Sequence, residues 1–357
     1  MKTPRFCFFT LAFLLILRLE SGAKPAGEVV GWGFNFSGEA TGVPTGYDAA
    51  TGTVMVAGQT LTNAVELAAG GGQGLALRNN GTVLGWGWNT FGQANGGPTT
   101  SNLLCCQVNI GDNILTDVIA IAAGRTHSIA LKNNGSVAVW GKLNSGEPPS
   151  VPSDLSNIVA VAAGWDSSLM LKSDGTVHGW DLQLPSRFKA SGEDLESQVS
   201  NGLTNIVAIA ASPEYFGNNY ALAGDGTVKQ WHNWHGAELV NVTGLSNVVA
   251  IAAGPNYGLA LKNNATVTGW GEESGATPVP VGLTNIIAIA TSGSSLPVES
   301  FALALKKDGT LVAWGTFNNH PVTVPAGLSN VVAIAAGGGC CLAITTNRAV
   351  AERFLQK

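Results

Sequence analysis

Residues 117–141, DVIAIAAGRTHSIALKNNGSVAVWG, decide the fold of this chain. Residues 118–122 predict a β-strand, because branched residues alternate with alanines along it. Residues 128–131 and 136–140 predict two more strands, joined by a tight turn at residues 132–135. Asn-Gly between two apolar runs is a strong hairpin signal, since both central residues of a type I′ turn need φ > 0. The stretch therefore predicts three consecutive antiparallel strands.

Variants of this module recur along the chain and predict one closed ring. Six copies are complete, whereas the seventh stops after residue 344. Residues 27–33 have the pattern of the third, Trp-containing strand of a module. No first or second strand of a module precedes them. The two incomplete ends complement each other. The first strands of the seven copies are residues 64–70, 118–124, 158–164, 206–212, 248–254, 286–292 and 331–337.

The repeat predicts an all-β fold, a seven-bladed β-propeller whose last blade is closed by the N- and C-terminal strands. A fourth strand is expected between each Trp and the next first strand, for example at residues 53–57, 104–110 and 278–281. Both faces of each blade pack on neighbouring blades. The innermost strands converge on the axis of the ring and need small side chains such as alanine, whereas a large side chain such as Trp fills the wider space between blades further out. The predicted core tryptophans are Trp32, Trp86, Trp140, Trp180, Trp231, Trp270 and Trp314.

The first 23 residues have the pattern of a signal peptide. Lys2 and Arg5 precede an apolar core at residues 6–17, and small residues follow at positions 21–23. An uncleaved anchor is the weaker alternative, because a spanning helix needs about 20 apolar residues. The expected organisation is a signal peptide at residues 1–23, one propeller at 24–346 and a tail at 347–357. No other stretch is apolar enough to span a membrane.

The composition limits the partners. The chain has 357 residues, 47 of them glycine, and only 11% are charged, which fits short strands and tight turns. Cleavage after Ala23 would leave 15 basic and 22 acidic residues with no basic run. Nucleic acid is therefore not expected as a partner, because its binding depends on Lys and Arg neutralising phosphates. A secreted or otherwise extracytoplasmic location is expected, at the cell surface or in the periplasm.

Four cysteines remain after cleavage, and they form two doublets. Four cysteines allow three connectivities, among which the sequence does not choose. A bridge between the doublets would suit an oxidising compartment. A metal site is disfavoured, because ligand cysteines are usually separated by two or more residues. The cysteines with a potential disulfide are Cys105, Cys106, Cys340 and Cys341.

Strand parity predicts a binding surface. The loops after the first strands and after the Trp strands lie on one side of the ring, here called the loop face, and the hairpin turns and connectors lie on the opposite side, the connector face. Aromatic residues and Arg on variable loops are typical of binding hot spots. The alternative is that several of these side chains fold back to cap the blades. The predicted partner-binding residues are Trp88, Phe91, Arg125, His127, Trp165, Asp166, Tyr215, Phe216, Trp234 and Tyr257, and the same loops carry Phe34, Phe36 and Phe317.

Catalysis and metal binding have weak support. His232 and His235, with His320, lack a carboxylate or cysteine that would complete a metal site. No Gly-x-Ser-x-Gly motif or Gly-rich phosphate loop occurs, and no nucleophile is paired with a base in a recognisable pattern. The sequence therefore predicts no metal, no cofactor and no enzymatic activity, with a secreted hydrolase or lyase as the alternative.

Residues 118–141 resemble the repeat of the regulator of chromosome condensation family, and the other six units resemble it less well. The resemblance covers about residues 27–346 and implies a seven-bladed propeller. The family includes a nuclear exchange factor for a small GTPase and exported bacterial proteins. The layout here is similar to a propeller-type bacterial β-lactamase inhibitory protein. The family's His remains only as His127, and the turn glycine is replaced by Ala265.

Together these observations predict an exported, monomeric binding module that recognises a protein or a glycan through its loop face. An exchange-factor-like regulator is disfavoured by the signal peptide and the acidic charge. A purely structural role in a cell envelope is the third alternative.

Overall fold

The computed structural model describes residues 24–46, 48–99, 106–142, 151, 155–165, 167–181, 203–214, 217–232, 239–271, 278–293 and 300–346. All regular elements in these ranges are β-strands. No helix among the described residues is long and apolar enough to cross a membrane. The predicted signal peptide (1–23) and tail (347–357) lie outside the described residues.

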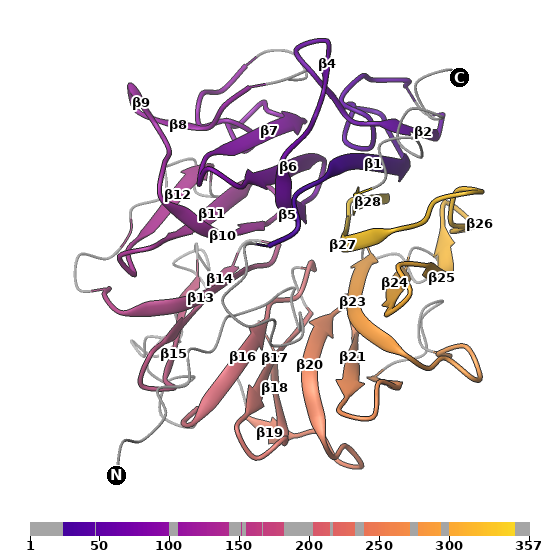
Figure 1. Ribbon diagram of the computed structural model, residues 1–357. Helices are drawn as coiled ribbons and strands as arrows, with labels where there is room; N and C mark the ends of the chain where they lie inside the picture. Colours follow the sequence, from indigo (N-terminus) through magenta and orange to yellow (C-terminus); the bar gives the residue numbers. More distant parts are fainter. Residues whose placement is uncertain are drawn as a thin grey trace.

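Seven antiparallel sheets surround a common centre within the described ranges (Figure 1), so the predicted propeller is confirmed. Blade 1 consists of β5 (Ala64–Ala69), β6 (Gln73–Arg78) and β7 (Val83–Gly87). Blade 2 consists of β10 (Val118–Ala123), β11 (His127–Lys132) and β12 (Val137–Gly141). Blade 3 consists of β13 (Ile158–Ala163), β14 (Ser167–Lys172) and β15 (Val177–Asp181). Blade 4 consists of β16 (Ile206–Ala210), β17 (Asn218–Ala223), β18 (Val228–His232) and β19 (Val240–Asn241). Blade 5 consists of β20 (Val248–Ala253), β21 (Tyr257–Lys262) and β22 (Val267–Gly271). Blade 6 consists of β23 (Ile286–Gly293), β24 (Ser300–Lys306), β25 (Leu311–Phe317) and β26 (His320–Pro321). Small hairpins, β3 (Met55–Val56) with β4 (Gln59–Thr60) and β8 (Asn109–Ile110) with β9 (Asn113–Ile114), lie outside these sheets.

Blade 7 joins the two ends of the described chain. It has the order β27 (Val331–Gly337), β28 (Cys340–Thr345), β1 (Glu28–Gly33) and β2 (Ala50–Thr53). Gly31 lies opposite Leu342 and Trp32 opposite Cys341 in the antiparallel pair of β1 and β28. The indigo β1 beside the yellow β28 in Figure 1 shows this closure, which the two incomplete repeats predicted.

The expected fourth strands are only partly present. Blades 4, 6 and 7 contain one, and Gln107 forms a single bridge to Leu84 in blade 1. Residues 278–281 form no strand, so that expectation is wrong. Pro278 and Pro280 have no N–H groups to donate to a neighbouring strand.

The hairpin between the second and third strands differs in type from the predicted turn. In the hairpin loop of blade 2, Gly135 has a positive φ of 78°, whereas Asn134 does not. Gly135 N donates to Lys132 O at 3.0 Å, and Lys132 N donates to Ser136 O at 2.9 Å. These bonds define a three-residue loop with one left-handed glycine rather than a type I′ turn.

The core lies between blades. In the cluster between blades 6 and 7, Leu303 and Leu305 pack with Ile334 and Trp32. Trp86 has no exposed surface, and its Nε1 donates to Glu39 O of the preceding blade at 3.0 Å. Trp32, Trp86, Trp140, Trp231 and Trp314 are buried, Trp270 is half-buried, and the side chain of Trp180 lies outside the described part of the structure.

Candidate functional site

Backbone hydrogen bonds hold the loops after the first strands side by side. Gly71 N donates to Gly124 O at 3.1 Å, linking blades 1 and 2. Arg125 N donates to Gly164 O at 3.2 Å, and Trp165 N donates to Ser212 O at 3.0 Å. The loops after the Trp strands join the same side, since Trp88 N donates to Gly72 O at 2.7 Å. The loop face is therefore a hydrogen-bonded surface, and its side chains project from a fixed frame.

Two of the Trp-strand loops share a framework built on a buried asparagine. Asn35 Oδ1 accepts hydrogen bonds from Ala40 N and Thr41 N at 2.9 and 3.1 Å. Asn89 Oδ1 accepts in the same way from Ala94 N and Asn95 N, at 2.8 and 3.3 Å. The sequence analysis missed this motif, although residues 35–42 (NFSGEATG) and 89–96 (NTFGQANG) share its spacing.

These frameworks present aromatic rings on the loop face. The rings of Phe34 and Phe36 stack with centroids 6.3 Å apart, and Phe34 packs on Phe317 at 5.6 Å. Phe36 is 44% exposed. Trp88 and Phe91 pack edge to face at 5.4 Å. The first group joins blades 6 and 7, and the second belongs to blade 1.

Cations accompany two of the rings. The Arg125 guanidinium lies over the Trp165 ring at 4.0 Å from its centroid. Lys142 Nζ lies 5.4 Å from the centroid of Phe91. Both distances fall within the range of cation–π interactions. Trp88, Phe91, Arg125 and Trp165 are half-buried on the loop face, so each ring or charge keeps part of its surface open to a partner.

His127 and Tyr257 are not surface anchors, and the prediction for them is wrong. His127 has no exposed surface, and its Nε2 lies 2.9 Å from Ser168 Oγ of the next blade. Burial lowers the pKa of His127 to about 4, so the imidazole is neutral at pH 7. Tyr257 is equally buried, and its hydroxyl donates to Phe301 O at 3.0 Å. Both residues start second strands, where the side chain points to the neighbouring blade rather than to solvent.

The remaining predicted residues divide into two groups. Cys340 and Cys341 are buried free thiols, so the proposed bridge between the doublets is wrong. Cys341 is part of the apolar core between blades 6 and 7, and burial raises the pKa of both thiols. Cys106 is half-buried. Cys105, Asp166, Tyr215, Phe216, Trp234 and His235 lie outside the described residues.

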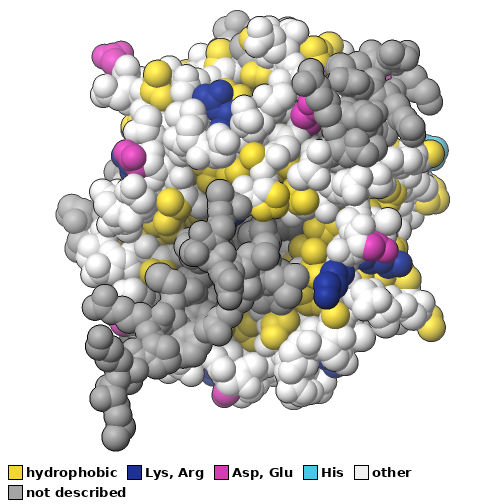
Figure 2. All heavy atoms as spheres, viewed as in Figure 1, with side chains coloured by type: hydrophobic (Ala, Val, Ile, Leu, Met, Phe, Trp, Pro, Cys, Tyr) yellow, Lys and Arg dark blue, Asp and Glu magenta, His cyan; other side chains and the backbone are white. Residues whose placement is uncertain are grey.

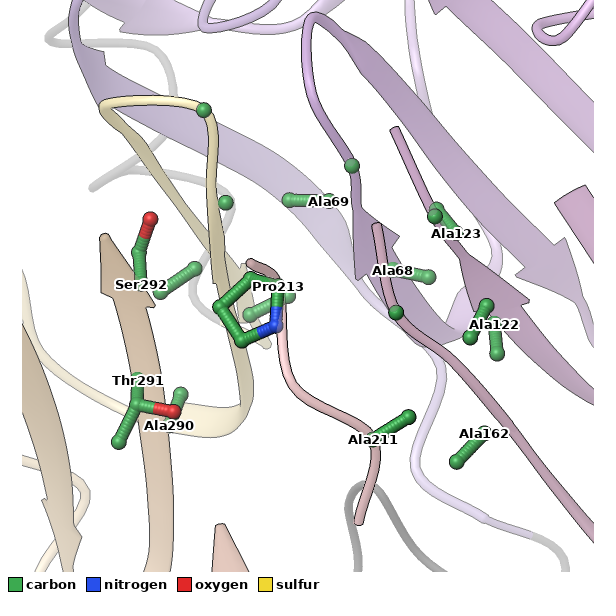
Figure 3. A pocket seen from close by; sticks show the side chains of 18 of the residues that line it. Ala68, Ala69, Ala122, Ala123, Ala162, Ala211, Pro213, Ala290, Thr291 and Ser292 are labelled. Atoms are coloured by element: carbon green, nitrogen blue, oxygen red, sulfur yellow. The ribbon is translucent and has the colours of Figure 1, made fainter. Parts of the chain in front are cut away.

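A cavity of about 380 Å³ opens on the axis of the ring. All seven innermost strands, or the residues directly after them, contribute to its lining. Figure 3 shows alanines of several blades around this space, with Pro213 and Thr291 across from Ala68 and Ala122. Figure 2 shows hydrophobic side chains gathered around the centre of the face in view. The alanines expected at the axis therefore surround a hollow.

Sequence comparisons identify known repeats to which parts of the chain are similar. Two family profiles described as "Regulator of chromosome condensation (RCC1) repeat" match, one at residues 64–93, 118–146 and 158–180, and the other at residues 80–131. The Ultraviolet-B receptor UVR8 of Arabidopsis thaliana is 32% identical over 73 residues, which are 20% of this chain. The matched segment spans only 16% of the receptor's length.

Solved structures give the fold over a larger part of the chain. Prp20p from Saccharomyces cerevisiae is similar with a TM-score of 0.69 and 19% identity, over 94% of this chain and 95% of that chain. Human WBSCR16 has a TM-score of 0.62 and 18% identity over 90% of this chain and 100% of that chain. The CRINKLY ectodomain of the Arabidopsis thaliana receptor kinase ACR4 has a TM-score of 0.54 and 18% identity, over 79% of this chain and 90% of that chain. Residues 64–146 and 158–180 are therefore similar to regulator of chromosome condensation repeats, and the described chain shares the propeller fold of these solved structures.

Proposed function

We propose that the chain is an exported binding module that docks on a protein partner through its loop face. The observation that carries this proposal is the set of aromatic side chains held on hydrogen-bonded loops of blades 1, 3, 6 and 7. These aromatic side chains lose little conformational entropy on binding, because the loops that carry them are already held by hydrogen bonds.

Relatives support the proposal by analogy of fold. The structure of Prp20p is described together with its binding to Gsp1p and histones. The ectodomain of the receptor kinase ACR4 shows the same kind of fold in an extracellular part of a protein. An extracellular role for this chain also agrees with the signal-peptide pattern of residues 1–23. We therefore place the protein outside the cytoplasm, as a secreted or cell-surface module.

Binding is favoured over catalysis by the state of the titratable groups. His127 is neutral and enclosed between two blades, so it does not reach a substrate on the loop face. Glu39 is also buried, and its Oε2 accepts the Ser37 N–H at 2.7 Å. These two groups support the structure of the loops and blades. Among the described loop-face residues, aromatic rings and the cations Arg125 and Lys142 remain partly exposed, which suits recognition.

Affinity capture from the native extracellular medium tests the proposal, with residues 24–357 as bait. The loop-face variant carries Phe36→Ala, Trp88→Ala, Phe91→Ala and Trp165→Ala. A matched control variant changes exposed apolar residues away from the loop face, namely Ile110→Ala, Ile114→Ala, Val240→Ala and Val281→Ala.

We expect the unmodified bait and the control variant to retain the same partner protein, and the loop-face variant to lose it. The captured partner is then titrated against all three baits, with an expected affinity loss of at least about tenfold for the loop-face variant. Equal affinity for the three baits would rule out docking through this face, and retention of a glycan alone would change the class of ligand.

A further inference from the structure

The axial cavity has a floor and a mouth. On β5 its lining begins at Glu66 and runs to Gly71, and on β10 it runs from Ala120 to Arg125. Both strands run towards the loop face, so Glu66 lies deep in the cavity and Arg125 lies at its mouth. Between these two levels the walls consist mainly of alanines, as Figure 3 shows for Ala68, Ala122 and Ala162. Along the described residues, the cavity is therefore lined mainly by apolar side chains between Glu66 and Arg125.

The floor of the cavity carries no net charge. Glu66 Oε2 pairs with Lys24 Nζ at 2.7 Å, and Glu66 Oε1 accepts the Ile121 N–H at 2.9 Å. Glu66 stands where the other six first strands have alanine. Its carboxylate is thus satisfied by two partners from within the chain, and a ligand in the cavity meets no uncompensated negative charge there.

The mouth is cationic. Glu66 and Arg125 are the two charged residues among the described residues that line the cavity. Because Glu66 is neutralised by Lys24, the charge that a ligand meets is that of Arg125, whose guanidinium is oriented by stacking on Trp165. Ser292 also lines the cavity, and its buried Oγ has no hydrogen-bond partner within the described part of the chain.

We propose that this cavity binds a slim aliphatic carboxylate, with the carboxylate on Arg125 and the alkyl chain along the alanine wall. A planar guanidinium binds a carboxylate through two parallel hydrogen bonds. The alkyl chain is removed from water by walls whose small side chains leave it room. The volume of about 380 Å³ falls within the range of small-molecule sites. This inference goes beyond the proposed function and does not depend on it, because the ligand is a small molecule and no protein partner is needed.

Calorimetric titration of residues 24–357 with a series of n-alkanoates, from butanoate to decanoate, tests the inference. n-Alkanols and n-alkylammonium ions of matched length are the controls. We expect saturable binding of one alkanoate per chain, with affinity rising roughly threefold to fourfold per added methylene until the cavity is filled. The alcohols and ammonium ions should bind at least about tenfold more weakly, since they lack the anionic group.

Two variants locate the site. Arg125→Met keeps the aliphatic stem but removes the charge, and it should weaken alkanoate binding by at least about tenfold. Lys142→Met removes another loop-face cation, one that does not line the cavity, and should leave binding unchanged. Ala211→Leu fills part of the cavity and should abolish binding of the longer alkanoates.

Near-UV circular dichroism confirms that each variant is folded before titration. The inference is overturned if no alkanoate binds saturably, if alkanols bind as tightly as alkanoates, or if folded Arg125→Met and Ala211→Leu proteins both bind like the unmodified chain. If the unmodified chain binds alkanoates but captures no partner protein, or if all three baits bind the partner equally, the result counts against the proposed function alone.

Discussion

His127 Nε2 lies 2.9 Å from Ser168 Oγ, and this contact joins blade 2 to blade 3. Two residues at the same position of other blades make equivalent contacts by different chemistry. Gln73 Nε2 donates to Gly124 O at 2.9 Å between blades 1 and 2, and the Tyr257 hydroxyl lies 3.3 Å from Ser292 O between blades 5 and 6. In these three blades the first residue of the second strand therefore bonds to the next blade, and its residue type differs from blade to blade.

His127 should make the protein sensitive to acid. Its pKa is about 4 in the folded state and 6.5 in an unfolded chain, so the unfolded state binds more protons below pH 6.5. The contribution of His127 to the free energy of unfolding is complete above pH 6.5. It is lost as the pH falls through 4, by up to about 3 kcal/mol. Urea unfolding at pH 7, 5 and 4 measures this loss. His127→Gln, which introduces the residue of blade 1, should lose less stability over that range. Parallel pH dependence of the two proteins would contradict the assignment.

Glu39 should act in the opposite direction. Burial raises the pKa of Glu39 from 4.5 to about 7. The folded state therefore binds the extra proton, and the contribution of Glu39 is complete below pH 4.5 and lost as the pH rises through 7. In blade 1 the matching residue is Gln93, whose Oε1 accepts the Phe91 N–H at 3.0 Å as Glu39 accepts that of Ser37.

As the pH rises from 4.5 to 8, we expect the free energy of unfolding of Glu39→Gln to increase by up to about 3 kcal/mol relative to that of the unmodified chain. Denaturant unfolding at both pH values provides the comparison. A stability difference between the two proteins that does not change with pH would show that Glu39 is ionised in the folded state as well.

Ala265 occupies a left-handed turn position that five other blades fill with glycine. Its φ is 61°, and the corresponding glycines, among them Gly135 and Gly309, have φ values of 78° and 79°. A side chain in this conformation costs roughly 1–2 kcal/mol, whereas glycine loses more entropy on folding. Ala265→Gly should therefore raise the free energy of unfolding by up to about 1 kcal/mol. Thermal unfolding measures it, with Ala138→Gly, inside a strand, as a control that should destabilise. A lower melting temperature for Ala265→Gly would refute the argument.

The Lys24–Glu66 pair offers a double-mutant cycle. Lys24 is partly exposed and Glu66 is nearly buried, so Lys24→Met should destabilise the protein by about 1 kcal/mol. Glu66→Ala introduces the residue of the other six blades and removes the charge that needs a partner. In that background Lys24→Met should have almost no effect. An equal cost of Lys24→Met with and without Glu66 would show that Lys24 acts through other contacts.

Deletion of residues 27–33 tests the closing blade. Without β1, the outer edge of β28 loses its antiparallel partner, and Trp32 no longer fills the core between blades 6 and 7. We expect the shortened chain to lose its single cooperative unfolding transition in calorimetry. An unchanged melting curve would mean that six blades and a two-stranded remnant are sufficient.

The sequence predicted the architecture because spacing is a property of the chain itself. The repeated Val/Ile-Ala pattern, the recurring Trp and the two incomplete ends required no knowledge of packing. The errors at His127, Tyr257 and Cys341 share one physical cause. Whether a residue next to a loop is exposed depends on the neighbouring blade, which lies about one repeat away in sequence. Phe36 and Trp165 were expected on the loop face by strand parity alone, whereas the axial cavity depends on how seven strands converge.

The pairing of Glu28 with Thr345 also sets an order of events during synthesis. Blades 1 to 6 are each built from one continuous stretch and can form as soon as that stretch is complete. The first strand of the propeller must wait for the last one, and contacts between residues so far apart in sequence form slowly. Until then β1 exposes an apolar Val-Val-Gly-Trp edge. Ring closure is therefore the step at which a nascent chain is most exposed to misassembly.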